Sequence, residues 1–242
     1  MENRVQSPVS VMKRVEMKYL LDARQTAFLR RSLEGHMAED AFGLTTIASL
    51  YYDTPNFRLV RASLEKPEFK EKLRLRAYGP ADDGSPVYLE LKRKAGGVVY
   101  KRRVQTTLPR AEAFFRGEGE LCEPGQIRRE IEAFRRYYGE LRPACVILYE
   151  RTAYFQPDGD LRLTIDRDPR YRMEGLDLTA APEGTPLLSP GSTILEIKVQ
   201  GAMPLWLSAI LSRGSICKTS FSKYGEAYSR MVRGERELLR AS

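Results

Sequence analysis

Basic side chains occupy every second position in several short segments, and most of these segments also carry a carboxylate. Segment by segment, the alternating residues are Arg14, Glu16 and Lys18; Lys72, Arg74 and Arg76; Glu90, Lys92 and Lys94; Arg162, Thr164 and Asp166; and Glu196 and Lys198. Arginine and lysine bind phosphate oxygens, and Mg²⁺ usually takes one or two carboxylates together with phosphates as its ligands. The pattern therefore predicts a site that binds a polyanion and its divalent metal.

The spacing of two also indicates which kind of element carries these residues. Successive side chains of a β-strand point to opposite faces, so each segment has one charged face and one apolar face, such as that of Leu73 and Leu75. A competing interpretation is the ordinary solvent-facing side of an antiparallel sheet, which also carries Lys and Arg. However, one sign recurs from segment to segment, and like charges opposite each other on neighbouring strands destabilise a sheet. An anionic ligand would remove that repulsion.

The composition is that of a folded domain with an anionic partner. The chain has 242 residues, of which 42% are hydrophobic and 30% are charged, so it can form a core and is not disordered. The formal net charge of +8 favours nucleic acid, an anionic membrane or phosphate compounds as partners. We expect a single domain over residues 1–242, with its core at about residues 10–230.

Residue types exclude several classes of site. His36 is the single histidine, which excludes most His-dependent triads and multi-His zinc sites. The three cysteines are far apart and predict reduced thiols instead of a metal or redox centre. The polar N-terminus lacks an apolar signal core, and no run approaches the about 18 apolar residues of a membrane span. These features predict a cytoplasmic protein.

Strands and helices are expected in a regular order. Strands are predicted at 14–21, 45–54, 70–79, 86–94, 98–108, 144–156, 160–167 and 192–200. Helices are predicted at 22–35, 108–117, 126–139 and 204–214, and in the final part of 215–232. Parallel strands would need long helical crossovers after most strands, and these are missing, so the sheet is antiparallel. The predicted fold class is α+β: a closed antiparallel β-barrel of about eight strands with flanking helices, whose lumen holds the charged faces.

The segments also match a known family when they are taken together and in order. The chain resembles the VTC domain, the polyphosphate polymerase domain of the triphosphate tunnel metalloenzyme (CYTH-like) superfamily, in the ordered set VEMKYLL, SLYYDTPN, KLRLRAYG, YLELKRK, ILYERTAY, LRLTIDRD, ILEIKV and SFSKY. The resemblance covers roughly residues 10 to 230, and its strength lies in the ordered set. It implies an antiparallel barrel whose tunnel binds a triphosphate together with Mn²⁺ or Mg²⁺.

The resemblance also implies roles for individual residues. The cations that would hold the reacting phosphates are Lys18, Arg74, Arg76, Lys92, Arg151, Arg162 and Lys223. The residues expected to complete the substrate-binding lining are Lys101, Arg103, Lys198 and Ser222, to which alternation adds Lys94 and Tyr149. For the metal, the resemblance implies Glu196, with Glu16 as the acidic neighbour of Lys18. Glu90 and Asp166 are the next metal candidates by their faces, and an ion pair with a neighbouring cation explains each of them equally well.

The first strand departs from one branch of the superfamily. It carries Arg14 where the thiamine-triphosphatase and adenylate-cyclase branch has the first glutamate of an E-x-E-x-K element. The change removes one metal-ligand carboxylate and adds a cation. It favours the VTC branch and argues against a two-metal hydrolase.

Three functions agree with these residues. The first is an ATP-dependent polyphosphate polymerase, in which the terminal phosphate of a phosphate acceptor attacks the γ-phosphorus. The second is an inorganic tripolyphosphatase or nucleoside triphosphatase, in which water attacks instead. The third is a non-catalytic module that binds polyphosphate or RNA, although the chain has no RNA-binding signature and no nucleic acid partner is expected. The basic surface also suits an anionic leaflet, which predicts a peripheral location at the inner face of a membrane, beside a membrane-protein partner.

Overall fold

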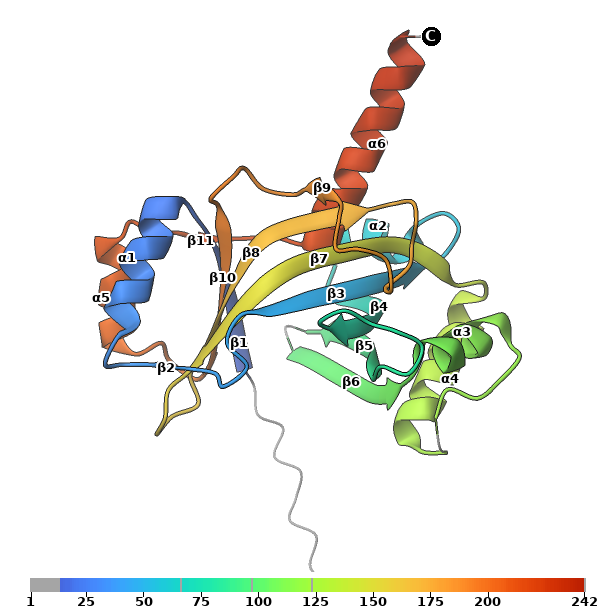
Figure 1. Cartoon of the computed structure of the whole chain (residues 1–242), viewed down its shortest axis with the longest axis horizontal. Coiled ribbons are helices and arrows are strands. Elements are labelled where there is room, and N and C mark those ends of the chain that lie inside the picture. The colour runs from blue at the N-terminus through green and yellow to red at the C-terminus, as the bar shows by residue number, and fades with distance from the viewer. Residues whose placement is uncertain (1–13, 66, 97, 123, 242) are drawn as a thin grey trace, which may run out of the picture.

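The computed structural model describes residues 14–65, 67–96, 98–122 and 124–241, which Figure 1 shows as coloured ribbon. Its eight long strands are β1 (Arg14–Leu21), β3 (Thr45–Asp53), β4 (Phe69–Tyr78), β5 (Val87–Ala95), β6 (Val98–Thr106), β7 (Arg142–Phe155), β8 (Arg162–Arg172) and β10 (Thr193–Gln200). Three further strands have two residues each: β2 (Ala38–Glu39), β9 (Thr185–Pro186) and β11 (Lys218–Thr219). All of them belong to one sheet. The domain boundary expected near residue 10 lies outside the described residues.

Six helices of the described residues accompany the sheet. They are α1 (Ala23–Leu33), α2 (Arg58–Leu64), α3 (Leu108–Arg116), α4 (Gln126–Tyr138), α5 (Leu205–Arg213) and α6 (Lys223–Ala241). The predicted start of α1 is confirmed, because Asp22 accepts a hydrogen bond from the backbone N–H of Gln25 and donates its own N–H to the Gln25 side chain. Such a reciprocal cap is decided by local sequence alone. No helix in the described ranges is both long enough and apolar enough to cross a membrane.

The sheet is antiparallel, as predicted, but it is not a closed barrel. The strand order is β11-β1-β10-β8-β7-β3-β4-β5-β6, with β2 beside β7 and β9 beside β8. The prediction of closure is wrong because, within the described residues, β6 does not pair with a strand at the other end. β1 is paired with β10 along one edge and with β11 along part of the other, so it has no fully free edge for β6. Alternation sets the face of each side chain, but it does not decide whether terminal strands come within hydrogen-bonding distance.

The sheet nevertheless curves so strongly that its two ends face each other. The Nζ atom of Lys92 in β5 lies 3.3 Å from Oε2 of Glu16 in β1. In the sheet order, five strands lie between β1 and β5. Pairing shifts register in β3, between Tyr51 and Tyr52, and again in β7. Such irregularities bend strands and increase their twist. The face that carries Glu16 and Lys92 is therefore concave, and we call it the inner face.

Apolar layers cover the opposite, outer face, and each layer lies under one pair of helices (Figure 1). Helices α3 and α4 cover β4 and β5 in a cluster that includes Leu73, Leu75, Leu89, Leu91, Phe114, Ile131 and Phe134. Helices α1 and α5 cover β1, β8 and β10 in a cluster that includes Leu29, Leu33, Leu163, Ile165, Leu195, Ile197, Leu207 and Ile210. The apolar faces predicted from alternation thus form the core, and burying them directs the charged faces inward.

Helices α2 and α6 close one part of the inner face. A third cluster joins Ile147 and Tyr149 of β7 to Val60 of α2 and to Tyr224 and Ala227 of α6. The start of α6 is therefore held against the inner face, where it brings its first residues to the charged side chains described below.

Candidate functional site

One group of charges on the inner face surrounds Glu90. Arg74 stands opposite Glu90 across β4 and β5, and it donates from Nε and NH2 to Glu90 Oε2 at 2.9 and 2.8 Å. Three further cations lie within ion-pair distance of Glu90: Lys101 at 2.6 Å, Arg103 at 3.6 Å and Arg76 at 4.0 Å. We call these five residues the Glu90 cluster. Glu90 lies on β5, and the neighbouring strands β4 and β6 each place two cations on the same face of the sheet. The pairing of the three strands therefore brings four cations to one carboxylate.

The charge on Glu90 is strongly stabilised. Its side chain is almost completely buried, with 1% of the residue exposed. Burial alone would raise the pKa of this carboxyl group, but Arg74, Arg76 and Lys101 more than offset burial and lower the pKa to about 2. Glu90 is therefore an anion at neutral pH, and the cluster carries a net positive charge that faces the inner surface.

A second group, the Asp166 cluster, consists of Asp166, Arg151 and Lys223. Arg151 of β7 donates from Nε and NH2 to the two carboxylate oxygens of Asp166, at 2.6 and 2.8 Å. Lys223, the first residue of α6, also donates to Asp166 and lies 4.1 Å from the centre of the Tyr149 ring. Burial opposes ionisation of Asp166, but Lys223 and Arg151 prevail and lower its pKa.

The third group, the Glu196 cluster, joins the two ends of the curved sheet and consists of Glu196, Lys198, Lys18, Glu16 and Lys92. Lys18 lies between two carboxylates, 3.8 Å from Glu16 and 3.8 Å from Glu196. Lys198 lies 2.5 Å from Glu196, and Lys92 reaches Glu16 from β5. Burial would raise the pKa of Glu196, but Lys198, Lys18 and Arg151 together hold it well below its usual range. In this cluster, Glu16 and Glu196 share the cation of Lys18.

The predicted residues are thus largely brought together, with two exceptions. Arg162 lies on the inner face opposite Lys198, but its guanidinium stands over the ring of Phe155, 5.3 Å from its centre, and donates to a backbone carbonyl. Lys94 lies opposite Lys70 across β4 and β5, and the structure records no ion pair for it within the described ranges. Both residues lie at an end of their strands, beyond the three clusters.

Three residues of the inner face were not predicted as site residues. Tyr51 of β3 accepts a hydrogen bond from Arg74 NH1 at 3.0 Å, and Ser49 accepts one from Arg76 Nε at 3.3 Å. Lys72 donates to Ser222 Oγ at 3.0 Å. The period-two pattern had already placed Lys72 on the charged face. By contrast, Ser49 and Tyr51 become visible only when β3 is known to pair with β4, because they stand opposite the arginines.

The residues that could hold a divalent metal lie in the Glu196 cluster. The described residues contain no group of three or more His, Cys, Asp or Glu side chains in metal-binding proximity. However, Mg²⁺ bound with a phosphate substrate usually needs only one or two protein carboxylates. Thr164 stands opposite Glu196 across β8 and β10, and its buried hydroxyl oxygen has no hydrogen-bond partner among the described residues. Glu196, Glu16 and this free hydroxyl are oxygen donors of the kind that such a metal takes.

Asp53, the last residue of β3, holds the start of α6 in place. This fully buried carboxylate accepts hydrogen bonds from the backbone N–H groups of Thr54, Leu59 and Val60, and from the hydroxyl of Tyr224 at 2.9 Å. It therefore ties β3, α2 and α6 to one another. Since Tyr224 follows Lys223 directly, this anchor also fixes the cation that contacts Asp166.

Replacement of Tyr224 by Phe is expected to lower the free energy of unfolding by about 1.5–3 kcal/mol, because it removes a buried hydrogen bond to a charged group. Urea denaturation followed by circular dichroism measures the change. Tyr100→Phe, at an exposed position, is the matched control. If the two variants were equally stable, Asp53 would not be the anchor of α6.

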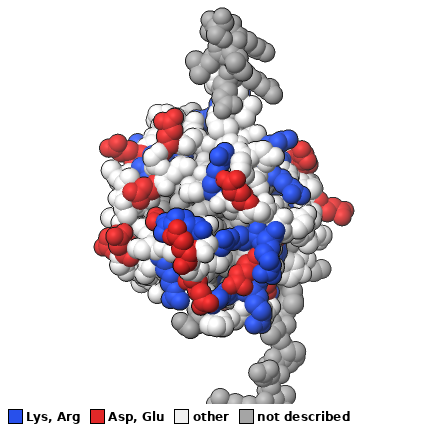
Figure 2. Space-filling model, turned by 90° about the vertical axis from the view of Figure 1, so that its right-hand side faces the viewer, with Lys and Arg blue, Asp and Glu red and all other residues white. Residues whose placement is uncertain are grey.

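Charges elsewhere on the surface are arranged differently. Figure 2 shows acidic and basic side chains interspersed over the side of the molecule on which α3 and α4 lie in Figure 1. Arg128 of α4, for example, donates to Glu120 at 2.6 Å and to Glu132 at 2.7 Å. Exposed pairs of this kind offset each other at the surface and contribute little. The concentration of cations therefore distinguishes the inner face.

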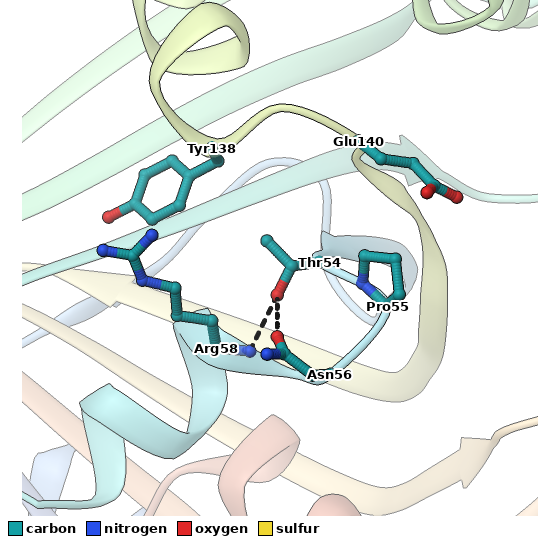
Figure 3. Close-up of a pocket in the computed structure, with 6 residues that line it drawn as sticks. All are labelled: Thr54, Pro55, Asn56, Arg58, Tyr138 and Glu140. Atoms are coloured by element: carbon teal, nitrogen blue, oxygen red, sulfur yellow. Dashed lines mark hydrogen bonds between the residues drawn. The ribbon is translucent and has the colours of Figure 1, made fainter.

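An open pocket between the start of α2 and the end of α4 shares no residue with the three clusters. Its lining consists of Thr54, Pro55, Asn56, Arg58, Tyr138 and Glu140. In Figure 3 the Arg58 side chain extends beneath the Tyr138 ring, and Thr54 contacts Asn56 and the backbone of Arg58. Thr54, Asn56 and Arg58 are thus engaged within the lining, which also carries the negative charge of Glu140, so the pocket offers less to an anion than the inner face does.

Known proteins resemble this chain in sequence and in fold. The family model described as the VTC domain matches residues 13–232. Vacuolar transporter chaperone complex subunit 4 of Schizosaccharomyces pombe is 32% identical over 143 residues, which amount to 50% of this chain and 20% of that protein. The chain thus matches about one fifth of the length of this relative.

Two solved bacterial structures align over most of their length. A protein from Bacillus halodurans, named as a candidate adenylate cyclase, aligns with a TM-score of 0.53 at 14% identity, covering 87% of this chain and 96% of its own. A second candidate adenylate cyclase, from Vibrio parahaemolyticus, aligns with a TM-score of 0.49 at 12% identity, covering 90% of this chain and 98% of its own. At such identity, the first of these likenesses indicates a common fold.

Proposed function

The chain belongs to the VTC domain family, and we propose that its inner face transfers the terminal phosphoryl group of a nucleoside triphosphate, most simply ATP, to a phosphate chain. The observation that supports this proposal is the convergence of cations on one concave surface. They come from β1, β4, β5, β6, β7, β10 and α6. A linear polyanion is the ligand whose charge matches such a surface.

The carboxylate partners of Arg74 and Arg151 orient these two arginines for binding phosphate. Glu90 engages Arg74 through Nε and NH2, and Asp166 engages Arg151 through the same two nitrogens. A guanidinium has five donors in a rigid plane, so these contacts fix its orientation without using all of its N–H groups. We assign to both arginines the binding of substrate phosphates, and to Glu90 and Asp166 the holding of these cations.

Phosphoryl transfer needs positioning and neutralisation of charge more than covalent help from the protein. An oxygen of the acceptor's terminal phosphate attacks the γ-phosphorus. The bond between that phosphorus and the β,γ-bridging oxygen breaks, and the nucleoside diphosphate leaves with the bonding electrons. Arg74, Arg151 and Lys223 hold the phosphates and lower the energy of the charge that develops on their oxygens.

For the divalent metal we propose Glu196 and Glu16 as ligands, with the Thr164 hydroxyl nearby, which no other described residue engages. A bound Mn²⁺ or Mg²⁺ supplies neutralisation of charge on the phosphate oxygens. Lys18, which lies between the two carboxylates, keeps them close together when they would otherwise repel each other.

Incubation of the purified protein with ATP and MnCl₂, followed by gel electrophoresis with a stain for polyphosphate, tests the polymerase. We expect chains that lengthen with time and that do not form in the presence of EDTA. Release of orthophosphate without chains would contradict the polymerase and identify a triphosphatase. Intact ATP together with bound polyphosphate would identify a non-catalytic module.

We also propose that the domain works at the surface of a membrane beside a partner protein. The Schizosaccharomyces pombe relative is named as a subunit of a complex, and the net positive charge of this chain favours anionic lipid headgroups. Sedimentation with vesicles that contain phosphatidylserine, compared with neutral vesicles, measures this affinity. Equal sedimentation with both kinds of vesicle would contradict it.

A further inference from the structure

Lys72 differs from the cations of the three clusters in having no carboxylate partner within the described residues. Arg74, Arg151, Lys18 and Lys92 each have one at 4.0 Å or less. The recorded hydrogen bond of the Lys72 ammonium is to the neutral hydroxyl of Ser222, at 3.0 Å. A half-buried cation without a counter-ion is costly, and a bound anion would compensate for it.

The surroundings of Lys72 add to the uncompensated charge. Lys72 stands opposite Lys92, which in turn stands opposite Lys101, so three lysines form a row across β4, β5 and β6. Lys101 has Glu90 as its partner and Lys92 has Glu16, but Lys72 has neither. Like charges at directly opposed positions destabilise a sheet. The positive charge at the Lys72 end of the row is therefore not compensated, and an anion bound there would be stabilised.

The position of Lys72 indicates which anion. The inner-face cations of β4 are Lys70, Lys72, Arg74 and Arg76, and the six residue-to-residue steps from Lys70 to Arg76 extend over about 20 Å. This row is longer than the three phosphates of a nucleoside triphosphate. If the arginines hold the triphosphate, Lys72 lies beside it, where further phosphates of a chain would pass. A lysine is a point charge on a flexible stem, which suits a chain that shifts its position.

We propose that Lys72, together with Ser222, forms a subsite for a phosphate of the polyphosphate chain outside the part of the site that a triphosphate fills. This inference rests on the proposed function, and it makes Lys72 a residue that favours long chains over free triphosphate. Ser222 is positioned for it by accepting the N–H of Gly225 at the start of α6, at 3.1 Å.

Calorimetric titration in EDTA tests the subsite by comparing long-chain polyphosphate with tripolyphosphate. Lys72→Met is expected to weaken binding of the long chain about tenfold, which corresponds to 1.4 kcal/mol, and to leave binding of tripolyphosphate nearly unchanged. Lys218→Met, which removes the same charge from an exposed lysine, is the matched control and is expected to affect neither ligand. An equal effect of Lys72→Met on both ligands, or no effect on either, would overturn the subsite.

Proton uptake gives a second measurement that does not depend on turnover. Burial, followed by Lys18, Lys70 and Lys92, lowers the pKa of Lys72 to about 8, while Tyr51 acts in the opposite direction. A phosphate bound beside the ammonium raises that pKa, so the long chain should bind at about pH 8.5 with uptake of a proton. Titrations in two buffers of different ionisation enthalpy measure the uptake.

Lys72→Met and Lys72→Arg are both expected to remove this uptake, and only Lys72→Arg is expected to keep the affinity for the long chain, because arginine remains protonated. Undiminished uptake in both variants would contradict the subsite. If the protein had no polymerase activity but still showed these differences in long-chain affinity and proton uptake, the proposed function would be wrong and the subsite would stand.

Discussion

Replacement of Glu196 by Gln is expected to reduce metal-dependent turnover at least about 100-fold, because neutralisation of phosphate charge by a metal is worth several kcal/mol. The amide keeps the size of the side chain but removes its negative charge. In this structure that charge is well stabilised, since Lys198, Lys18 and Arg151 hold the pKa of Glu196 far below its usual range despite its burial. Initial rates of polyphosphate formation against Mn²⁺ concentration measure the loss.

A binding measurement separates loss of the metal from loss of the fold. Electron paramagnetic resonance of Mn²⁺ with a non-hydrolysable triphosphate analogue should show weaker metal binding in Glu196→Gln. Thermal unfolding should remain cooperative, because Lys18 keeps Glu16 as a partner. Glu118→Gln, in an exposed ion pair with Arg116, removes the same charge and should behave as wild type. Turnover near the wild-type rate in Glu196→Gln would exclude Glu196 as a metal ligand.

Replacement of Arg74 by Ala is expected to weaken binding of a triphosphate by about 1.5–3 kcal/mol, the contribution of a hydrogen bond to a charged group. Arg74→Lys should recover only part of the affinity, because an ammonium lacks the planar fork of donors. Calorimetry with tripolyphosphate measures both variants, and Arg116→Ala at an exposed site is the control. Unchanged affinity in Arg74→Ala would show that this arginine does not contact the phosphates.

The same variant should also lose stability, because it leaves the buried carboxylate of Glu90 with fewer partners. Breaking a buried ion pair costs about 3–5 kcal/mol, and the lower end is expected here since Lys101 and Arg103 remain within 2.6 and 3.6 Å of Glu90. Urea denaturation at neutral pH measures the loss. A variant as stable as wild type would show that these two cations suffice for Glu90.

The pH dependence of this loss has a definite sign. The pKa of Glu90 falls from 4.5 to about 2 in the folded protein, although burial opposes the change. A carboxyl group with a lowered folded-state pKa contributes stability above its unfolded pKa and loses that contribution as the pH falls through the folded value. The difference in stability between wild type and Arg74→Ala should therefore be full above about pH 5 and should shrink between about pH 4.5 and pH 2.

Much of the candidate site followed from alternation alone. Once a segment such as KLRLR is recognised as a strand, period two places Arg74 and Arg76 on one face and Leu73 and Leu75 on the other. Because the leucines are buried beneath α3 and α4, the arginines must point to the opposite face of the sheet. This inference needs no knowledge of neighbouring strands, and for that reason it succeeded for residues from both ends of the chain.

Partners across strands could not be predicted in this way. Glu90 and Asp166 were each open to two interpretations, as metal ligands or as ion-pair partners, because alternation does not say which cation stands opposite. Register places Glu90 between Arg74 and Arg103, and Asp166 opposite Arg151. Ser49 and Tyr51 of β3 were missed for the same reason, since neither is charged and only the pairing with β4 brings them to the arginines.

The sequence by itself determined the face of the charged residues in the alternating strands, the antiparallel class and the family, because these depend on local periodicity and on an ordered set of segments. The tertiary structure decided that β11 takes part of the edge of β1, that the sheet curves without closing, and that α6 delivers Lys223 to Asp166. Such contacts depend on the distance between segments far apart in the chain. Strand curvature and helix packing set that distance, and neither can be read from spacing.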